Sequence, residues 1–391
     1  MRISGFLFLI LFTMACGAPK QTAQEKPQPQ DYITYVSDSL TFDHLAEVEL
    51  MDYNEETEEL ILLDRKSREV LIIDMTGEII SKFNPHIEGP SYVGNYDHGW
   101  VFYGENKLIC FSNYYFYELT KGGEYIARHK YPVEVRGIWS LDYLPEMSIS
   151  YTSPEGDPMF LAFITEPEGP SYNTQAFQDS AYMIYRMDFE TGVSRPIMKK
   201  SAESIYRTLG AFVDRGWPYF GQVDNNLVVV AYSIDDQFYL YDANTDELIQ
   251  TFEIPEEFKP KYETVTFGSK EKSDVLRINN RVMTDGEHIF LSVLSKIPES
   301  VERVLRRQEN WRQSQAYEEA LKKYSNRTTL VYNLGGTYLG QVNNGVGPLS
   351  YDMESTSEGF YWVQRRYSDE RPYKTFLKIK VKPMEEVASK K

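Results

Sequence analysis

Short apolar runs alternate with polar turns along most of the chain. The clearest case is residues 70–83 (VLIIDMTGEIISKF), where two runs rich in β-branched residues flank a turn that holds Asp74 and Gly77. This pattern predicts a β-hairpin, because glycine readily adopts the positive φ that tight turns require. The same hairpin phrase (strand, polar turn, strand) returns in weaker form at residues 115–128, 183–195, 238–252 and 329–341. A further apolar strand precedes each copy, at residues 60–63, 108–111, 159–164, 227–232 and 289–294.

The repeated return of this unit predicts a β-propeller, in which each repeat forms one blade. A sixth unit combines residues 359–364 with residues 374–381, but no outer strand follows it. Residues 32–36 (YITYV) alternate like a strand and have no partner of their own. Pairing these segments would close the ring and remove its free edges. We therefore expect an all-β fold of six four-stranded blades closed by the N-terminal strand. Seven blades are the alternative, because the long third and fifth units have room for another.

A second repeat lies between the hairpins. The sequence EGPSY occurs at residues 88–92 and again at 168–172, and a looser copy occupies residues 347–351. Gly followed by Pro makes a tight, stiff turn, which is typical of a connection between blades. The alternative is that these loops line one rim of the ring and present Tyr92, Tyr172 and Tyr351 to a ligand.

One segment does not follow the strand pattern. In residues 298–325, apolar residues recur at spacings of three, four and seven with charges between them. This spacing predicts an inserted amphipathic helix of about seven turns. Its apolar stripe either packs over the edge or mouth of the propeller, or docks a partner through Trp311, Tyr317 and Tyr324.

The N-terminus carries export signals. Residues 1–15 hold one cation, Arg2, and then an apolar run that is too short to span a membrane, which predicts a signal peptide. Cys16 follows a small residue and resembles the cysteine of a bacterial lipobox, although Thr13 departs from the usual Leu. The resemblance implies lipid on Cys16; an ordinary signal peptide is the alternative. Polar residues after Cys16 predict a flexible tether over 16–31. We expect a single domain over 32–384 and a disordered tail over 385–391.

Composition excludes several functions. The net charge of −17 and the pI of about 4.9 argue against a nucleic-acid partner, which would require clustered cations. Cys110 is the only other cysteine, lies in an apolar run and predicts a buried thiol without a disulfide. The chain lacks the common catalytic motifs, and its five histidines are scattered. Residues 242–253 resemble a calcium loop, but Glu247 stands where that loop needs Gly. We expect no metal, no cofactor and a monomer.

The best candidates for a binding surface are aromatic and arginine residues in irregular segments. Aromatic rings stack on sugars or apolar groups, and arginine binds carboxylates. Structural packing is the alternative for these residues, and Trp100 and Trp362 belong to strand patterns that predict core positions. The candidate ligand-binding residues are Arg136, Trp139, Arg215, Trp217 and Tyr219.

The terminal cysteine, the polar tether and the repeated strand-Asp-x-x-Gly-strand phrase with its Gly-Pro turn resemble the six-bladed β-propeller lipoproteins of Bacteroidota. Within them, the chain is similar to a group defined only as a domain of unknown function. The resemblance implies a fold and a place in the cell envelope, but no catalytic residues. Gly17 and the lack of an acid just after Cys16 favour the outer membrane, by analogy, with either a periplasmic or a surface orientation.

Two functions are compatible with this fold. The first is a non-enzymatic binding or scaffold lipoprotein that holds a protein, peptide or glycan at one face of the ring. The second is an enzyme that acts on carbohydrate with acidic residues at the central axis. An axial pocket lined by acids beside an Arg or His would favour the enzyme, whereas a plugged axis with exposed aromatic residues on the rim would favour binding.

Overall fold

The computed structural model describes residues 29–95, 97–112, 115–131, 148–163, 170–214, 216–224, 226–271, 273–343, 349–367 and 369–384. Four antiparallel sheets contain four strands each, in sequence order. Their strands are β2 (Val48–Asn54), β3 (Glu59–Asp64), β4 (Glu69–Asp74) and β5 (Ile79–Phe83); β6 (Asp97–Tyr103), β7 (Lys107–Ser112), β8 (Tyr115–Thr120) and β9 (Tyr125–Lys130); β10 (Ser148–Thr152), β11 (Pro158–Phe163), β12 (Ile184–Asp188) and β13 (Val193–Ile197); and β14 (Pro218–Gln222), β15 (Leu227–Tyr232), β16 (Gln237–Asp242) and β17 (Glu247–Glu253).

A fifth sheet of nine strands joins the two ends of the domain, in the order β18-β19-β20-β21-β22-β1-β25-β24-β23. Its N-terminal strand β1 runs parallel to β22 and antiparallel to β25. The strands of this sheet are β1 (Gln30–Asp43), β18 (Lys261–Tyr262), β19 (Val275–Thr284), β20 (His288–Ser295), β21 (Arg327–Asn333), β22 (Tyr338–Asn343), β23 (Leu349–Ser355), β24 (Tyr361–Arg365) and β25 (Tyr373–Pro383).

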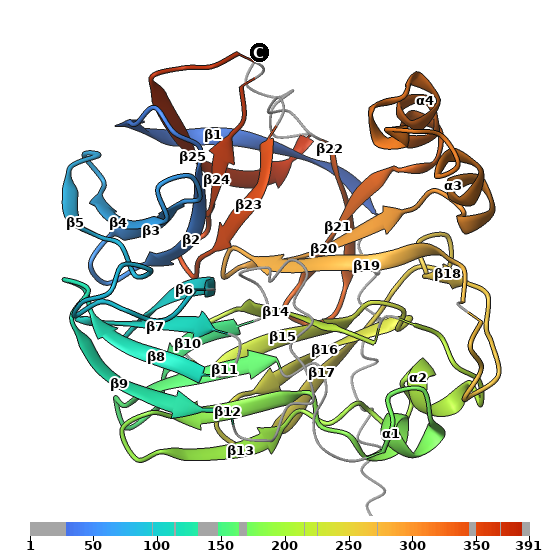
Figure 1. The fold of residues 1–391 in the computed structure, drawn as a ribbon. Helices are drawn as coiled ribbons and strands as arrows, with labels where there is room; N and C mark the ends of the chain where they lie inside the picture. Colours follow the sequence, from blue (N-terminus) through green and yellow to red (C-terminus); the bar gives the residue numbers. More distant parts are fainter. Residues whose placement is uncertain are drawn as a thin grey trace, which may run out of the picture.

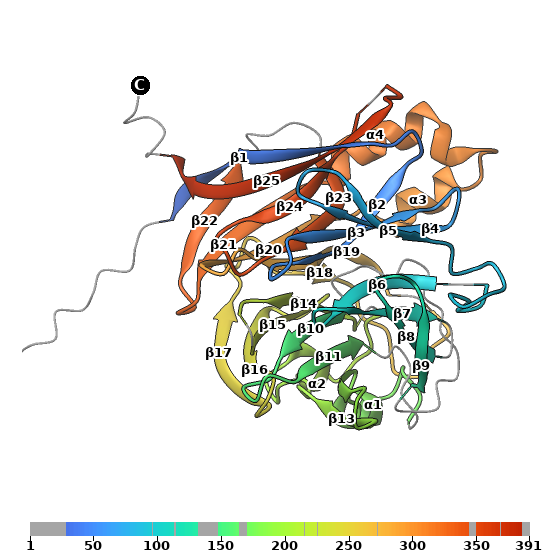
Figure 2. The ribbon, with the colours of Figure 1, turned by 90° about the vertical axis from the view of Figure 1, so that its left-hand side faces the viewer.

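The sheets are arranged in chain order around a common centre, as Figures 1 and 2 show. Strands β2, β6, β10, β14, β19 and β23 lie innermost; each contacts the next, and β23 contacts β2. This arrangement makes the chain a β-propeller and brings the first and last inner strands together.

Hydrophobic burial explains the continuous apolar runs of the middle strands. Leu60, Ile61, Leu62 and Leu63 of β3 are at most 1% exposed, because neighbouring sheets cover both faces of the strand. Strands buried on both faces do not need the alternation of a half-exposed strand. The core therefore lies in the layers between sheets.

Aspartate side chains close several of the repeated hairpin turns. Asp64 accepts hydrogen bonds from the N–H groups of Lys66 and Ser67 at 2.8 and 2.9 Å. Asp188 and Asp242 bind the backbone two and three residues ahead in the same way. Such local bonds fix a tight turn and explain the aspartate of the repeated phrase. At Asp242, the resemblance to a calcium loop coincides with this turn.

The prediction of one continuous helix over residues 298–325 is wrong. The segment forms α3 (Glu299–Leu305), a 3-10 turn η2 (Trp311–Gln313) and α4 (Gln315–Tyr324). Asn310 adopts a left-handed conformation with φ 53°, which interrupts the helical path. Asparagine tolerates this conformation better than most residues, so it makes a low-cost break. The insert projects from the side of the propeller (Figure 1).

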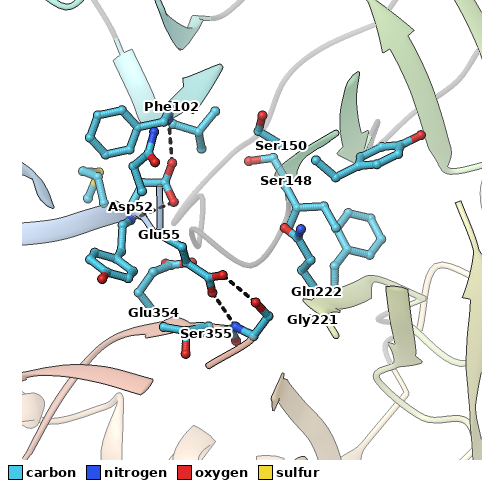
Figure 3. Close-up of a pocket in the computed structure, with 18 of the residues that line it drawn as sticks. Asp52, Glu55, Phe102, Ser148, Ser150, Gly221, Gln222, Glu354 and Ser355 are labelled. Atoms are coloured by element: carbon cyan, nitrogen blue, oxygen red, sulfur yellow. Dashed lines mark hydrogen bonds between the residues drawn. The ribbon is translucent and has the colours of Figure 1, made fainter. Parts of the chain in front are cut away.

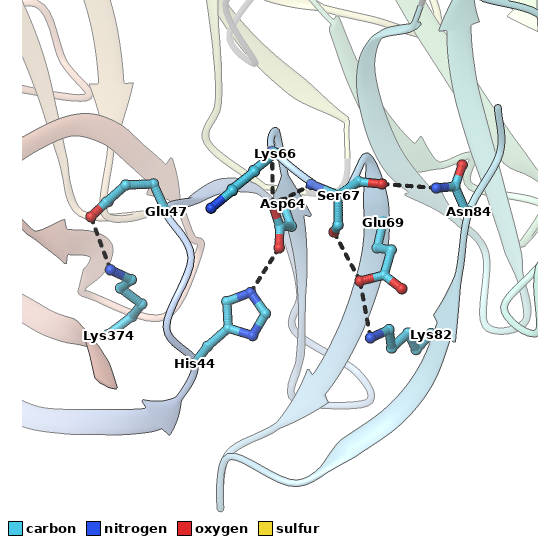
Figure 4. Close-up of polar contacts among 9 residues, drawn as sticks. All are labelled: His44, Glu47, Asp64, Lys66, Ser67, Glu69, Lys82, Asn84 and Lys374. Carbon is cyan, nitrogen blue, oxygen red and sulfur yellow. Dashed lines mark hydrogen bonds and ion pairs between the residues drawn. The ribbon is translucent and has the colours of Figure 1, made fainter. Parts of the chain in front are cut away.

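Polar contacts join the connection between β1 and β2 to the neighbouring strands β3 and β25 (Figure 4). His44 Nε2 lies 3.0 Å from Asp64 Oδ2, at the end of β3. Lys374 Nζ on β25 lies 2.9 Å from Glu47 Oε1, just before β2. These contacts link the last sheet to the first near the start of the domain.

Several expectations are confirmed by the structure. The N-terminal strand pairs with residues 374–381, although β1 starts at Gln30, inside the segment predicted as tether. Cys110, Trp100 and Trp362 are buried, as their strand patterns predicted.

The sequence did not predict two short helices between strands, α1 (Gln175–Ser180) and α2 (Ile205–Thr208). No helix within the described residues is long and apolar enough to cross a membrane. The predicted signal peptide, Cys16 and the tail over 385–391 lie outside the described residues.

Candidate functional site

A cavity of about 160 Å³ lies among the inner strands. Asp52 of β2 and Glu354 of β23 line one side, and Ser148 and Ser150 of β10 with Gln222 of β14 line the opposite side (Figure 3). We call this space the axial cavity. Its position at the meeting point of the sheets brings together residues from opposite ends of the chain.

Backbone geometry sets the position of Asp52. The β2–β3 register shifts between Leu50 and Asp52, and such a bulge can redirect a side chain. The carboxylate accepts the N–H of Phe102 on β6 at 2.6 Å and the N–H of Tyr53 at 2.9 Å. Burial nevertheless raises the pKa of Asp52 to about 7, and the charge of Glu55 adds to the effect.

Glu354 is the second acid of the cavity. Burial raises the pKa of Glu354 well above its usual range, and the negative charge of Asp52 raises it further. Arg281 on β19, itself 4% exposed, acts in the opposite direction through its positive charge. Two carboxyl groups in one buried space resist double ionisation, so the pair retains a proton to higher pH than an exposed acid.

Glu55 connects two chain segments on the same side of the cavity through hydrogen bonds. Its carboxylate accepts hydrogen bonds from the N–H and the hydroxyl of Ser357, which follows β23. These bonds tie the turn after β2 to the segment after β23. The two elements that carry Asp52 and Glu354 are therefore held together beside the acids.

The described residues of the opposite wall carry uncharged polar groups. Ser148 is 3% exposed, and its hydroxyl has no hydrogen-bond partner among the described residues. Ser150 and the amide of Gln222 lie beside it, facing the acids (Figure 3). A buried hydroxyl without a partner is costly in a folded protein, so it marks a position where a ligand or water can bind.

The described ligand-binding candidates lie elsewhere. Trp217 and Tyr92 are partly exposed, at 36% and 42%, and neither lines the axial cavity. Tyr172 is half-buried, and its hydroxyl accepts the N–H of Gly216 at 2.7 Å. Tyr219 is 5% exposed and belongs to the core, so its ring serves packing between sheets. The structure does not bring these residues into one site.

Other candidates lie outside the described residues: Arg136, Trp139, Arg215 and Cys16. The side chain of Tyr351 is also outside the description. In the insert, the rings of Trp311 and Tyr317 meet edge to face at 4.9 Å, and Tyr324 is half-buried. Trp311 and Tyr317 therefore contact each other within the insert.

Sequence reasoning missed Asp52 and Glu354. The one available signal was an acid among apolar neighbours in an inner strand, as in the β2 sequence VELMDYN. That signal is weak in a chain with 58 acidic residues, because exposed strand faces also carry acids. Within the described residues, no group of three or more His, Cys, Asp or Glu side chains is arranged to hold a metal ion.

Comparison with known proteins supports the fold. No protein-family model matches the chain, and a search of curated proteins finds no significant relative. A solved structure of a member of the DUF4221 family from Bacteroides vulgatus matches at 10% identity and a TM-score of 0.59, covering 91% of this chain and all of that one.

Two further structures match at lower TM-scores. A candidate exported protein from Bacteroides fragilis matches at 10% identity and a TM-score of 0.49, covering 90% of this chain and 96% of that one. A streptogramin B lyase matches at 9% identity and a TM-score of 0.41, covering 89% of this chain and 98% of that one. At 10% identity, the match to the DUF4221 structure shows a shared fold and does not indicate a function. The function has to be argued from the residues of the site.

Proposed function

We propose that this protein is a lipoprotein of the cell envelope that binds the end of a glycan in its axial cavity. The observation that carries the proposal is the cavity itself, with acids on one side and hydroxyl and amide groups on the other. Carboxylates, hydroxyls and amides together form the hydrogen bonds that a polyhydroxylated ligand needs. Aromatic residues such as Phe102 and Phe220 also line the cavity and offer apolar contact for a sugar ring.

The size of the cavity supports a small ligand. Its volume of about 160 Å³ is close to that of cavities that admit one benzene-sized ring. A single sugar residue fits this scale better than a peptide or a protein segment. We therefore propose that the cavity holds one terminal sugar.

For the architecture, we propose six blades. On this interpretation, the nine-stranded sheet contains two blades, joined where β1 lies between β22 and β25. The contact of β23 with β2 supports a ring closed by the N-terminal strand.

A second candidate function is hydrolysis of a glycosidic bond. The pKa of Asp52, raised to about 7 by burial, suits a general acid that is still protonated near neutral pH. Glu354 in the same cavity would supply the second carboxyl group that such reactions use. Acids at the axis beside Arg281 are the arrangement that favours the enzymatic alternative.

Isothermal titration calorimetry with the full chain and a panel of monosaccharides tests the binding proposal. Asp52→Asn and Glu354→Gln should weaken binding of a sugar ligand roughly tenfold or more, since each replaces an acceptor oxygen of the site with an amide NH2 group that only donates. Glu155→Gln is a matched control, because Glu155 lies in an exposed turn outside the cavity. Equal binding by all three variants would refute an axial site.

Hydrolysis of chromogenic glycosides separates the two functions. Release of the chromophore that disappears in Asp52→Asn but persists in Glu155→Gln would establish the enzyme. Binding without turnover would support the non-enzymatic protein.

The envelope location has its own test. Cys16→Ser should abolish labelling by a fatty acid and shift the protein from the membrane to the soluble fraction. Unchanged fractionation with Ser at this position would refute the lipid anchor.

A further inference from the structure

The axial cavity carries a one-sided charge. The described residues that line it include four acids, Asp52, Glu55, Glu56 and Glu354. No Lys, Arg or His is among these described lining residues. Arg281 acts on Glu354 from nearby and offsets part of this charge. Acidic groups still predominate, so the cavity attracts positive charge more strongly than a neutral sugar requires.

The acids differ in how far they are already engaged. Glu55 binds the N–H and the hydroxyl of Ser357. Asp52 accepts two backbone N–H groups, one on each oxygen, and each oxygen keeps a further lone pair. Glu55 likewise accepts one hydrogen bond on each oxygen, and Glu56 is exposed. Burial disfavours the charged form of Asp52 and Glu354, so these are the acids that gain most from the positive charge of a ligand.

An independent feature also marks a ligand position. The hydroxyl of Ser148, on the wall that faces Asp52 and Glu354, is buried and has no hydrogen-bond partner within the described part of the chain. Asp52, Glu354 and Ser148 come from three different sheets and lie around the same space. Together they place three oxygen acceptors on the walls of one cavity.

We infer that the axial cavity recognises a primary ammonium group, and that its ligand is an amino sugar. This inference rests on the proposed glycan-binding function and specifies the class of sugar. An ammonium group has three N–H donors, which match the carboxylates of Asp52 and Glu354 and the hydroxyl of Ser148. Its charge replaces the proton that the two acids otherwise retain, and Ser150 and Gln222 are left for the ring hydroxyls.

Binding should therefore be coupled to proton release. Burial and Glu55 raise the pKa of Asp52. Burial and Asp52 raise the pKa of Glu354, and Arg281 lowers it. Below about pH 7 a proton competes with the ammonium group, so affinity should rise as pH rises, by up to about tenfold per pH unit. A neutral sugar does not displace this proton and should show a flat profile.

Calorimetry with three related sugars tests the inference. Glucosamine, N-acetylglucosamine and glucose share one ring, and only glucosamine carries the ammonium group. Glucosamine should bind roughly 10- to 100-fold tighter than the other two, as expected for hydrogen bonds between charged groups. Titrations in buffers of different ionisation enthalpy should show release of a proton with glucosamine alone. Asp52→Asn should reduce this preference, whereas Glu155→Gln should retain it.

The outcomes distinguish this inference from the function on which it rests. Equal or tighter binding of glucose or N-acetylglucosamine, lost in Glu354→Gln, would overturn the ammonium site and leave axial glycan binding in place. Failure of all three sugars to bind would overturn both. Calcium binding that excludes glucosamine would also overturn the ammonium site. The comparison of sugars and its pH profile use the unmodified protein, so they decide the matter even where a variant does not fold.

Discussion

Replacing Asp52 with Asn should stabilise the folded protein at alkaline pH but not at acidic pH. Burial raises the pKa of Asp52 from 3.8 to about 7, so the folded state retains a proton that the unfolded state has released. Between these values stability falls as pH rises, because the native state binds more protons than the unfolded state. The shift of about three pKa units corresponds to a loss of roughly 4 kcal/mol above about pH 7.

Asn removes the cost of the buried charge but adds the smaller cost of a lost hydrogen bond. Asp52 offers an oxygen to each of two N–H donors, Phe102 and Tyr53, whereas Asn has a single oxygen. An unsatisfied donor costs about 1–3 kcal/mol, so the net gain at alkaline pH is about 1–3 kcal/mol. At about pH 5, only about one unit above the ordinary pKa of 3.8, the electrostatic cost is roughly 1.6 kcal/mol, and the lost hydrogen bond offsets it, so the substitution brings no gain.

Urea unfolding followed by tryptophan fluorescence measures this difference. Wild type, Asp52→Asn and the control Glu155→Gln would be compared at about pH 5 and about pH 8.5, on either side of the raised pKa. The expected result is a higher unfolding midpoint for Asp52→Asn at the alkaline pH alone. Equal shifts at both pH values, or greater destabilisation at alkaline pH, would show that Asp52 does not carry a buried charge cost.

Three further predictions concern the architecture. Gly340→Ala should lower the urea midpoint and expose β1 to proteolysis, because a Cβ at this position (φ +145°) would lie 1.7 Å from the carbonyl oxygen of Gln30. Gly192→Ala, with open space around it, controls for backbone strain alone. An equal loss of stability in both variants would contradict the β1–β22 contact. His86→Ala should cost more stability at about pH 5.5 than at about pH 8.5, since the hydrogen bond to Asp97 raises the pKa of His86 and its contribution is lost as pH rises through that pKa. A pH-independent loss of thermal stability would count against this pair. Trp311→Ala should increase hydrogen exchange over residues 298–325 with little change in the global urea midpoint, because the indole of Trp311 packs on Tyr317 inside the insert. A large drop in the global urea midpoint would mean that the insert stabilises the whole propeller.

Local patterns in the sequence were enough to indicate the repeating part of the fold. The hairpin phrase combines β-branched arms with an Asp or Gly turn, and both features act over a few residues. The apolar run around Cys110 indicated a buried strand for the same reason, and the unpaired strand near Tyr32 indicated where the ring would need a partner. These inferences need only neighbouring residues and the cost of an exposed edge.

The insert shows the limit of periodicity. Its apolar spacing correctly indicated helix, but one residue with a left-handed backbone, Asn310, divides the segment. A hydrophobic repeat reports which face is buried, and it does not report whether the backbone path is continuous. Two of the aromatic residues predicted to dock a partner, Trp311 and Tyr317, contact each other within the insert.

The candidate site was decided by tertiary structure alone. Asp52 and Glu354 lie near opposite ends of the domain, and each sits in a short strand that resembles many others in an acidic chain. Their importance arises because the inner strands meet at one centre, where burial raises both pKa values. The charge of Glu55 adds to this effect at Asp52, and the charge of Asp52 adds to it at Glu354. Burial and charge proximity depend on distances between residues from different sheets, which hydrophobic patterning along the chain does not contain. The sequence by itself therefore determined the repeating blades, and the ring that they form determined the chemistry at its axis.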